Sequence, residues 1–268
     1  MKPYQAIAIQ DCGEPLVAIP LSNFPVSYGA ESGHEGGLPS QLEHLPPLTL
    51  PAADRLVAVI PHPYQELGAP YDHQSPFSLR SGVLAALIKA QALLQQRQPG
   101  WCLQVFDAYR PLAVQRFMVE HTFQALVRDR RLQPETLSPP QYQQMMAEVE
   151  QFWATPSDRP ETPPPHSTGA AIDLTLVDAR GQPVAMGSPI DEISPRSFPD
   201  YYSQTNHPQA EVFNYHRQLL HQVMVTAGFR RHPQEWWHFS LGDQMWTWLV
   251  SLDSDGPAGV ARYGRVET

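Results

Sequence analysis

The sequence predicts an α+β fold in which an antiparallel sheet carries a set of polar residues and helices pack against one side of that sheet. Apolar residues recur with period 2 in some stretches and at helical spacing in others, and the two kinds of stretch are segregated instead of alternating as regular βαβ units. Of the 268 residues, 42% are hydrophobic, which is enough for a full buried core. We expect an N-terminal extension over residues 1–53 and one main domain over residues 54–268, since no shift in composition divides the later motifs.

The N-terminal extension is expected to be partly irregular. Short apolar runs mix with prolines over residues 1–28, and Gly, Ser and Pro are frequent over residues 29–53. His34, Glu35 and His44 lie in this polar stretch without a supporting apolar alternation. They are therefore interpreted as surface residues and not as metal ligands.

The main domain is expected to begin with a short strand over residues 54–61 and to contain four helices. Apolar residues at helical spacing predict these helices over residues 80–97, 112–129, 139–154 and 208–227. The last helix is expected to end at Gly228, because glycine is a common residue just past a helix C-terminus. The third helix carries an apolar stripe that we interpret as core packing and not as a substrate groove, formed by Tyr142, Met145, Met146, Val149 and Trp153.

Composition and charge narrow the classes of partner. The chain has 18 basic and 27 acidic residues, a net charge of −9 and no run of Lys or Arg, which argues against nucleic acid or an anionic membrane surface. The N-terminus lacks a long apolar h-region and no apolar run can span a bilayer, so a cytoplasmic location is expected. Cys12 and Cys102 are far apart in the sequence and are interpreted as buried free thiols.

The first of three polar clusters follows a proline-dense linker over residues 156–165. His166 opens a tight Ser-Thr-Gly turn, and the stretch A-I-D-L-T-L then alternates, with Ile and Leu on one face and Asp173 on the other. Asp173 is therefore expected on a strand, pointing away from its apolar neighbours. On its own the pair also fits a surface histidine in a turn and an aspartate on a solvated strand face.

The second cluster is E-W-W-H, in which Glu235 and His238 flank two tryptophans. In this apolar setting an unpaired carboxylate or imidazole would be costly. His166, Asp173 and His238 can together supply three ligands to a zinc ion and leave a fourth tetrahedral position for water, whose proton Glu235 can take. Such an arrangement is typical of a hydrolase and not of a structural zinc site. The alternative is that the tryptophans are ordinary core aromatics and His238 a satisfied core histidine.

The third cluster is F-D-A-Y-R-P at 106–111. Leu103 and Val105 indicate a strand before it, and apolar residues at helical spacing follow it, so Arg110 is expected at a strand-to-helix junction. A guanidinium group there can stabilise the oxyanion that forms when a carbonyl is attacked. The alternative is a helix-start arginine that pairs with Asp107.

Five motifs occur in order along the chain: F-S-L-R at 77–80, D-A-Y-R-P at 107–111, H-S-T-G-A-A-I-D-L-T-L at 166–176, P-V-A-M-G-S-P-I-D at 183–191, and G-F followed by E-W-W-H-F between 228 and 239. Together they resemble the D-alanyl-D-alanine dipeptidases, the branch of zinc peptidases that includes the vancomycin-resistance dipeptidase. The resemblance covers about three-fifths of the chain. It implies the D-Ala-D-Ala peptidase fold for a catalytic domain over residues 54–268, one Zn²⁺ per chain and hydrolysis of free D-Ala-D-Ala to two D-alanines.

The resemblance also implies roles for the polar residues of the three clusters. In the family pattern the zinc ligands fall on His166, Asp173 and His238, the general acid/base on Glu235 and the transition-state stabiliser on Arg110.

The fourth motif ends at Asp191, the family position that binds the ammonium group of the substrate. A family tyrosine that contacts the same ammonium group is assigned to Tyr71, with Tyr64 as the second candidate. The chain departs from the family pattern at Pro164 and Pro165, where the family has serines that bind substrate. Strict selectivity for D-Ala-D-Ala therefore does not follow from the resemblance.

Two other functions remain open from the sequence. A D,D-carboxypeptidase or peptidoglycan endopeptidase would act on longer peptides outside the membrane, and both the N-terminus and Asp191 argue against it. A zinc-stabilised binding module without catalysis would need neither Glu235 nor Arg110. The expected partner is a small zwitterionic dipeptide, and the sequence does not specify an oligomeric state.

Overall fold

A computed structural model describes residues 7–22, 55–253 and 259–266. Its strands are β1 Leu16–Ala18, β2 Val57–Ala58, β3 Ser78–Arg80, β4 Cys102–Asp107, β5 Ala171–Val177, β6 Arg230–Arg231 and β7 His238–Ser240. Strands β1 and β3 form a two-stranded sheet, and the other five form the main sheet in the order β2-β4-β5-β7-β6. The main sheet is antiparallel apart from the parallel pair of β2 and β4. The α+β class predicted from the sequence is confirmed.

The four predicted helices lie close to their predicted positions, as α2 Ser81–Arg97, α3 Leu112–Asp129, α4 Pro139–Val149 and α5 Ala210–Ala227. The described residues also form two helices that were not predicted, α1 Pro63–Glu66 and α6 Gln244–Leu252, and short 3₁₀ turns at Pro134–Thr136, Pro165–Thr168, Pro195–Ser197 and Tyr201–Ser203. Helix α5 ends as expected at Gly228, whose φ of 118° is left-handed and suits glycine. The strand expected over residues 54–61 is confined to the two residues of β2.

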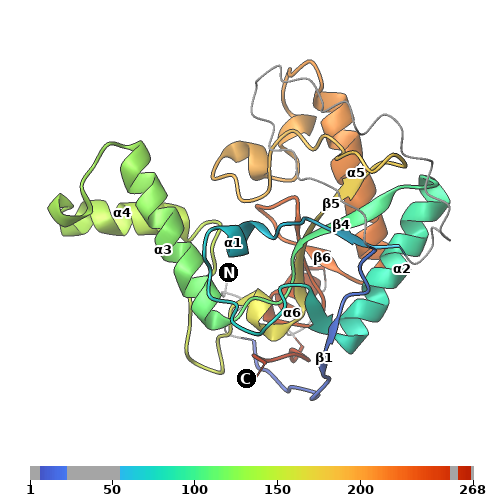
Figure 1. Cartoon of the computed structure of the whole chain (residues 1–268), viewed down its shortest axis with the longest axis horizontal. Coiled ribbons are helices and arrows are strands. Elements are labelled where there is room, and N and C mark those ends of the chain that lie inside the picture. Colours follow the sequence, from blue (N-terminus) through green and yellow to red (C-terminus); the bar gives the residue numbers. More distant parts are fainter. Residues whose placement is uncertain (1–6, 23–54, 254–258, 267–268) are drawn as a thin grey trace.

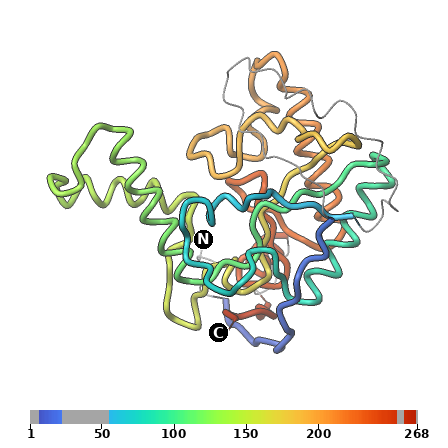
Figure 2. Tube along the Cα trace, viewed as in Figure 1, coloured from blue at the N-terminus to red at the C-terminus, as the bar shows by residue number. Residues whose placement is uncertain are grey.

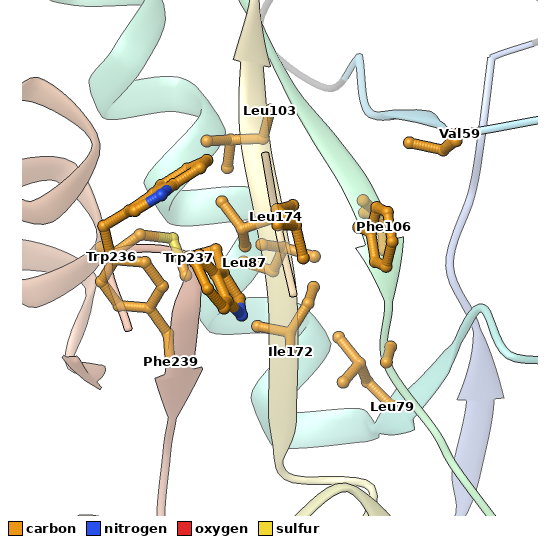
Figure 3. Packing of buried hydrophobic residues seen from close by; sticks show 14 of the residues in the cluster. Val59, Leu79, Leu87, Leu103, Phe106, Ile172, Leu174, Trp236, Trp237 and Phe239 are labelled. Atoms are coloured by element: carbon orange, nitrogen blue, oxygen red, sulfur yellow. The ribbon is translucent and has the colours of Figure 1, made fainter. Parts of the chain in front are cut away.

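Helices α2 and α5 pack against each other on one side of the main sheet (Figure 1). Figure 3 shows the core between them and the sheet, where Leu87 of α2 meets side chains of β4 and β5 and the paired rings of Trp236 and Trp237. On the other side of the molecule, α4 and the end of α3 project away from the main body (Figure 1). The side chains of the main sheet therefore have different surroundings on its two faces.

Helix α4 ends at Val149, five residues before the predicted end at 154. Met145, Val149 and Trp153 are buried, as expected for the apolar stripe. The prediction is wrong for Tyr142, which is 48% exposed, because this helix belongs to the projecting arm and covers little of the core. Trp153 lies beyond the helix, in the turn that leads back to the main body.

Strand β5 lies in the middle of the main sheet, and all seven of its residues are buried. The alternative of a solvated face around Asp173 is therefore wrong. Asp173 does point away from Ile172 and Leu174, but into a polar interior and not into solvent. A buried carboxylate needs partners of opposite charge or hydrogen-bond donors, and its neighbours supply them.

The described part of the N-terminal extension packs on the main domain. Strand β1 pairs with β3, Ile9 forms a bridge with Ala261, and Asp11 forms an ion pair with Arg80 at 3.0 Å. Figure 2 shows residues 7–22 next to the last described residues. A boundary at 53 stays a prediction, and His34, Glu35 and His44 lie outside the described residues.

Both cysteines are free thiols, as expected. Cys102 is buried, but Cys12 is exposed, so the prediction of a buried thiol is wrong there. Among the described residues, no helix has the length and apolar character needed to cross a membrane. The cytoplasmic location stays a prediction.

Candidate active site

The register of the main sheet places three of the polar residues next to one another. Asp107 of β4 lies opposite Asp173 of β5, which in turn lies opposite His238 of β7. Residues directly opposite on antiparallel strands project from the same face of a sheet. The next pair, Ile172 and Phe239, points to the other face and into the core (Figure 3). The alternation seen in the sequence thus separates the core from a row of polar groups.

His166 reaches this row from a 3₁₀ turn that follows the buried prolines of the linker. The turn closes at Gly169, whose φ is +70°. A Cβ atom there would overlap the side chain of Leu16, so the turn needs glycine for both its conformation and its space. His166 Nδ1 lies 2.6 Å from the carbonyl oxygen of Ala108, and this hydrogen bond fixes the direction of the ring.

Three ligand atoms converge from these elements. His166 Nε2 lies 3.1 Å from His238 Nδ1 and 3.2 Å from an oxygen of Asp173, and His238 Nδ1 lies 3.0 Å from the other oxygen. Tetrahedral zinc with bonds of about 2.0–2.1 Å holds its ligand atoms about 3.4 Å apart. The three atoms therefore have nearly the spacing that one such ion requires, and all three residues are buried.

The hydrogen bonds around the two histidines favour a bound cation. His166 Nδ1 donates to Ala108, and His238 Nε2 lies 3.4 Å from the hydroxyl of Ser240, which donates to Asp243 at 2.9 Å. With the ring protons on these outer nitrogens, both inner nitrogens present lone pairs to each other and to the Asp173 carboxylate. Such an arrangement is repulsive without a positive charge at its centre. The residues present therefore fit a metal ion.

The charge states agree with this ligand set. Burial tends to raise the pKa of Asp173, but His166 and His238, with protons on their inner nitrogens, hold it well below its ordinary value. A cation in place of those protons would favour the carboxylate form of Asp173 in the same way. Burial lowers the pKa of His238 even though Asp173 opposes the change, which keeps its imidazole neutral. A neutral imidazole and a carboxylate are the forms that bind metals.

Glu235 lies beside the cluster and is 7% exposed. Its Oε2 is 3.9 Å from His238 Nδ1, and its Oε1 is 3.6 Å from the Nδ1 atom of His232. Burial, together with the negative charges of Asp173 and Asp191, raises the pKa of Glu235 well above its ordinary value. A raised pKa makes its carboxylate a stronger proton acceptor than a carboxylate in water.

Arg110 is buried and lines the same cavity as Asp173 and His238. Its guanidinium forms ion pairs with Asp107 at 2.8 Å and Asp173 at 3.2 Å, and it donates to Gln115 at 3.0 Å. The pairing with Asp107 considered from the sequence is thus present. It coexists with a position next to the candidate ligands, so the two interpretations of Arg110 do not exclude each other.

Asp191 faces the same cavity and accepts a hydrogen bond of 2.6 Å from the hydroxyl of Tyr64. The hydroxyl of Tyr71 instead donates to Asp107 at 2.7 Å. The structure therefore places Tyr64, the second candidate, next to Asp191. Tyr71 instead contacts Asp107, the carboxylate that pairs with Arg110. Burial, followed by the charge of Asp173, raises the pKa of Asp191 to about 7.

A cavity of about 240 Å³ joins these groups. Its wall contains His166, Asp173, His238, Glu235, Arg110, Asp191 and residues 150–154 after α4. Sites for drug-sized ligands usually measure about 300–1,000 Å³. The cavity is therefore suited to a small molecule.

Comparison with known proteins assigns the chain to a family. The model of the peptidase M15 family, described as D-Ala-D-Ala dipeptidase, matches residues 58–253. The chain belongs to the D-Ala-D-Ala dipeptidase family. It is thus a hydrolase of the metallopeptidase class, and the resemblance seen in five motifs is confirmed.

Three relatives that are named D-alanyl-D-alanine dipeptidase differ in the share of the chain that aligns with them. The D-alanyl-D-alanine dipeptidase of Synechocystis sp. is 45% identical over 274 residues, which cover 100% of this chain and 98% of the relative. The one from Escherichia coli is 42% identical over 76 residues, 28% of this chain and 37% of the relative. The one from Enterococcus faecalis is 38% identical over 80 residues, 30% of this chain and 37% of the relative. The N-terminal extension therefore lies within the alignment to the Synechocystis dipeptidase.

The structure adds residues to the dipeptidase site that the sequence did not indicate. His62 lies 3.1 Å from Asp107 and, with Tyr71, fixes the carboxylate that holds Arg110. The ring of Trp153 lies 4.9 Å from the Arg110 guanidinium. His232 lies beside Glu235, a position that was also not expected. These three residues lie outside the five motifs, and the apolar spacing that includes Trp153 indicated core packing and not a place in the site.

Proposed function

We propose that the chain hydrolyses free D-alanyl-D-alanine to two D-alanines, using one zinc ion held by His166, Asp173 and His238. The observation that supports the proposal most is the convergence of three metal-ligand atoms beside buried Glu235 and Arg110 in one small cavity. The Synechocystis relative, which aligns over this whole chain, carries the same activity in its name.

A zinc ion bound there would lower the pKa of a water ligand to about 7 and polarise the substrate carbonyl. Glu235 takes the proton of the attacking water, for which its raised pKa is suited, and then passes the proton to the leaving amine. Arg110 has five N–H groups, and four of them are used by Asp107, Gln115, Tyr64 and Asp173. The remaining N–H has no hydrogen-bond partner among the described residues and is available to the oxyanion that develops on the carbonyl.

Asp191 binds the substrate ammonium in this proposal, and the hydrogen bond from the Tyr64 hydroxyl orients the Asp191 carboxylate. An ammonium group beside Asp191 stabilises the carboxylate form of a residue whose pKa burial has raised. We therefore assign the tyrosine of this contact to Tyr64 in place of Tyr71. Asp191 and the proposed metal ligands line the same cavity, and its volume of about 240 Å³ suits a substrate as small as a dipeptide.

The proposal is tested by incubating the zinc-loaded protein with D-Ala-D-Ala, with L-Ala-L-Ala and with a tripeptide ending in D-Ala-D-Ala, and by measuring free alanine. Release from D-Ala-D-Ala is expected to be the fastest. Mixed or other D-containing dipeptides are also expected to be cleaved, since Pro164 and Pro165 carry no hydroxyl groups. Faster cleavage of long peptides would replace the dipeptidase proposal with the carboxypeptidase alternative.

Blocking the substrate ammonium is expected to abolish most of the activity. N-acetyl-D-Ala-D-Ala places a neutral, bulkier amide against the Asp191 carboxylate, which then stays buried without a counter-charge. Asp191→Ala is expected to lower kcat/KM for the free dipeptide far more than for the blocked one. Equal losses for both substrates, measured as free alanine, would remove Asp191 from the ammonium contact.

Arg110→Ala is expected to lose about 10²- to 10³-fold in kcat, the usual effect of removing an oxyanion donor. The metal content is expected to remain, because His166, Asp173 and His238 are untouched. Steady-state kinetics and elemental analysis on the same preparation check both points. A variant with near-normal kcat would show that the substituted guanidinium has no part in the reaction.

A further inference from the structure

Arg217 of α5 is completely buried, and its guanidinium donates hydrogen bonds to four neutral acceptors. Its Nε donates to Met186 O at 2.7 Å, and one terminal nitrogen donates to Phe198 O at 2.9 Å. The other terminal nitrogen donates to Arg196 O at 2.8 Å and to Ser188 Oγ at 3.1 Å. This side chain thus binds mainly backbone carbonyls and not the carboxylates that usually accompany a buried guanidinium.

The four acceptors lie at the two ends of segment 186–198. Met186 and Ser188 begin this segment, Arg196 and Phe198 end it, and Asp191 lies between the two pairs. One planar guanidinium therefore ties the beginning of the segment to its end. Arg217 of α5 thus joins the two ends of the loop that carries Asp191, beside a hydrogen bond of 3.3 Å that Ser188 Oγ donates directly to Arg196 O.

The conformation of this loop needs external support. Asp191 has a φ of +65°, a left-handed conformation that is unfavourable for a residue other than glycine and persists only where its surroundings fix it. Gly187 has a φ of +86°, and a Cβ atom there would overlap the ring of Tyr202. The hydroxyl of Tyr202 donates to Gly187 O, and the guanidinium of Arg217 lies 4.8 Å from the same ring.

The same guanidinium also meets the segment that carries Glu235. Trp236, the next residue, donates from its ring nitrogen to Ser188 Oγ at 2.9 Å and from its backbone to Ser197 O at 3.1 Å. Arg217 lies 5.4 Å from the centre of the Trp236 ring. Segment 186–198 is therefore joined to the segment that carries Glu235 and His238.

A buried guanidinium loses its hydration, and hydrogen bonds to neutral groups replace it only in part, so Arg217 is not expected to add much to the stability of the fold. Its presence is better explained by the position in which it holds the two ends of segment 186–198. Burial lowers the pKa of Arg217 to about 10, and the side chain is still charged at neutral pH. A lysine would offer three donors from one point and could not reach both ends of the segment in the same plane.

We infer that Arg217 is a positioning residue that holds segment 186–198 so that Asp191 can receive the substrate ammonium. The inference rests on the proposed function, because it takes Asp191 to be the ammonium contact. Arg217 touches no substrate itself and acts through the backbone of the loop.

The test compares D-Ala-D-Ala with propionyl-D-alanine, which has the same shape but lacks the α-amino group. The ratio of the Ki of propionyl-D-alanine to the KM of D-Ala-D-Ala measures the preference for the ammonium. A hydrogen-bonded charge pair predicts a preference of about 10- to 100-fold in the wild type. Arg217→Lys is expected to lower this preference about tenfold, mainly by raising KM.

Arg80→Lys is the matched control. Arg80 is also buried and donates to backbone oxygens, at 2.8 Å to Thr168 and 3.1 Å to Gly264, but it does not contact segment 186–198. This variant is expected to keep the ammonium preference of the wild type, whatever stability it loses. An equal fall in preference in both variants would overturn the inference.

Asp191→Ala supplies the second control, because a positioning residue acts only through the residue that it positions. In the Asp191→Ala background, Arg217→Lys is expected to change the ratio less than twofold, a non-additive result. If Arg217→Lys does not fold, Ser188→Ala removes one acceptor of the network and is expected to lower the preference about threefold. An unchanged preference in the folded variants would overturn the inference, whereas a wild type that does not cleave D-Ala-D-Ala would overturn the proposed function instead.

Discussion

Glu235→Gln is expected to retain its zinc and to lose about 10²- to 10⁴-fold or more in turnover, the usual contribution of a positioned acid/base. The amide has nearly the shape of the carboxylate, so the contacts of the buried side chain with its neighbours are preserved. It cannot accept the proton of the attacking water, and it cannot return one to the leaving amine. Removal of a negative charge near Asp173 and Asp191 is not expected to weaken the metal site.

The kinetic effect is measured as kcat for D-Ala-D-Ala at saturating zinc, with the zinc content of each preparation determined in parallel. Glu120→Gln is a control for the loss of one carboxylate, because Glu120 is exposed on α3 and bonds only to Gln124 among the described residues. It is expected to turn over like the wild type. A Glu235→Gln protein that retains wild-type kcat would show that another group moves the proton.

His166→Ala and His238→Ala are each expected to abolish high-affinity zinc binding and, with it, activity. Each substitution leaves two of the three ligand atoms that lie within 3.0–3.2 Å of one another. Two protein ligands do not complete the three-ligand set of a catalytic zinc site. The inner nitrogen of the remaining histidine and the carboxylate of Asp173 would then be the only two atoms left of the three-ligand set.

Elemental analysis after dialysis against a defined free zinc concentration checks this expectation. His216→Ala is the matched control, because His216 also contacts a backbone carbonyl oxygen, at 2.7 Å from Ala185, but lies outside the three-residue cluster. It is expected to keep one zinc per chain. Full zinc content in both ligand variants would remove the two histidines from the metal site.

The helices could be predicted from the sequence because their apolar spacing is local information. The spacing fixed α2, α3 and α5 to within two residues. The predicted helix over residues 139–154 is too long because Trp153 continues the apolar stripe beyond Val149, where α4 ends. The ring of Trp153 instead lies in the following turn and packs against Arg110. The burial of β5 on both faces could not be predicted, since a strand that alternates polar and apolar residues has the pattern of a half-solvated one.

Most of the site residues could be located because they fall in contiguous motifs with a specific chemical composition. The choice between Tyr64 and Tyr71 could not be made in this way, since Tyr64 lies in the short helix α1, Tyr71 lies in a loop, and neither belongs to one of the five motifs. Only the tertiary structure shows that their hydroxyl groups point to different carboxylates. The support of Asp107 by His62 depends on a contact across 45 positions in the sequence. Contacts of this kind are set by tertiary packing, which no local pattern contains.

The cross-strand alignment of Asp107, Asp173 and His238 makes the polar row depend on the correct register of the sheet. A slip of one residue between β5 and β7 would turn His238 toward the helices and bring Phe239 opposite Asp173. If His238 is a metal ligand as proposed, a chain paired in this way would lack one ligand and gain nothing from the metal, whereas binding would stabilise the correctly aligned chain. Metal ions present during folding would therefore select against misaligned sheets. An insertion or deletion within either strand would therefore have two effects, because it would disturb the packing of the core and also weaken the binding of the ion.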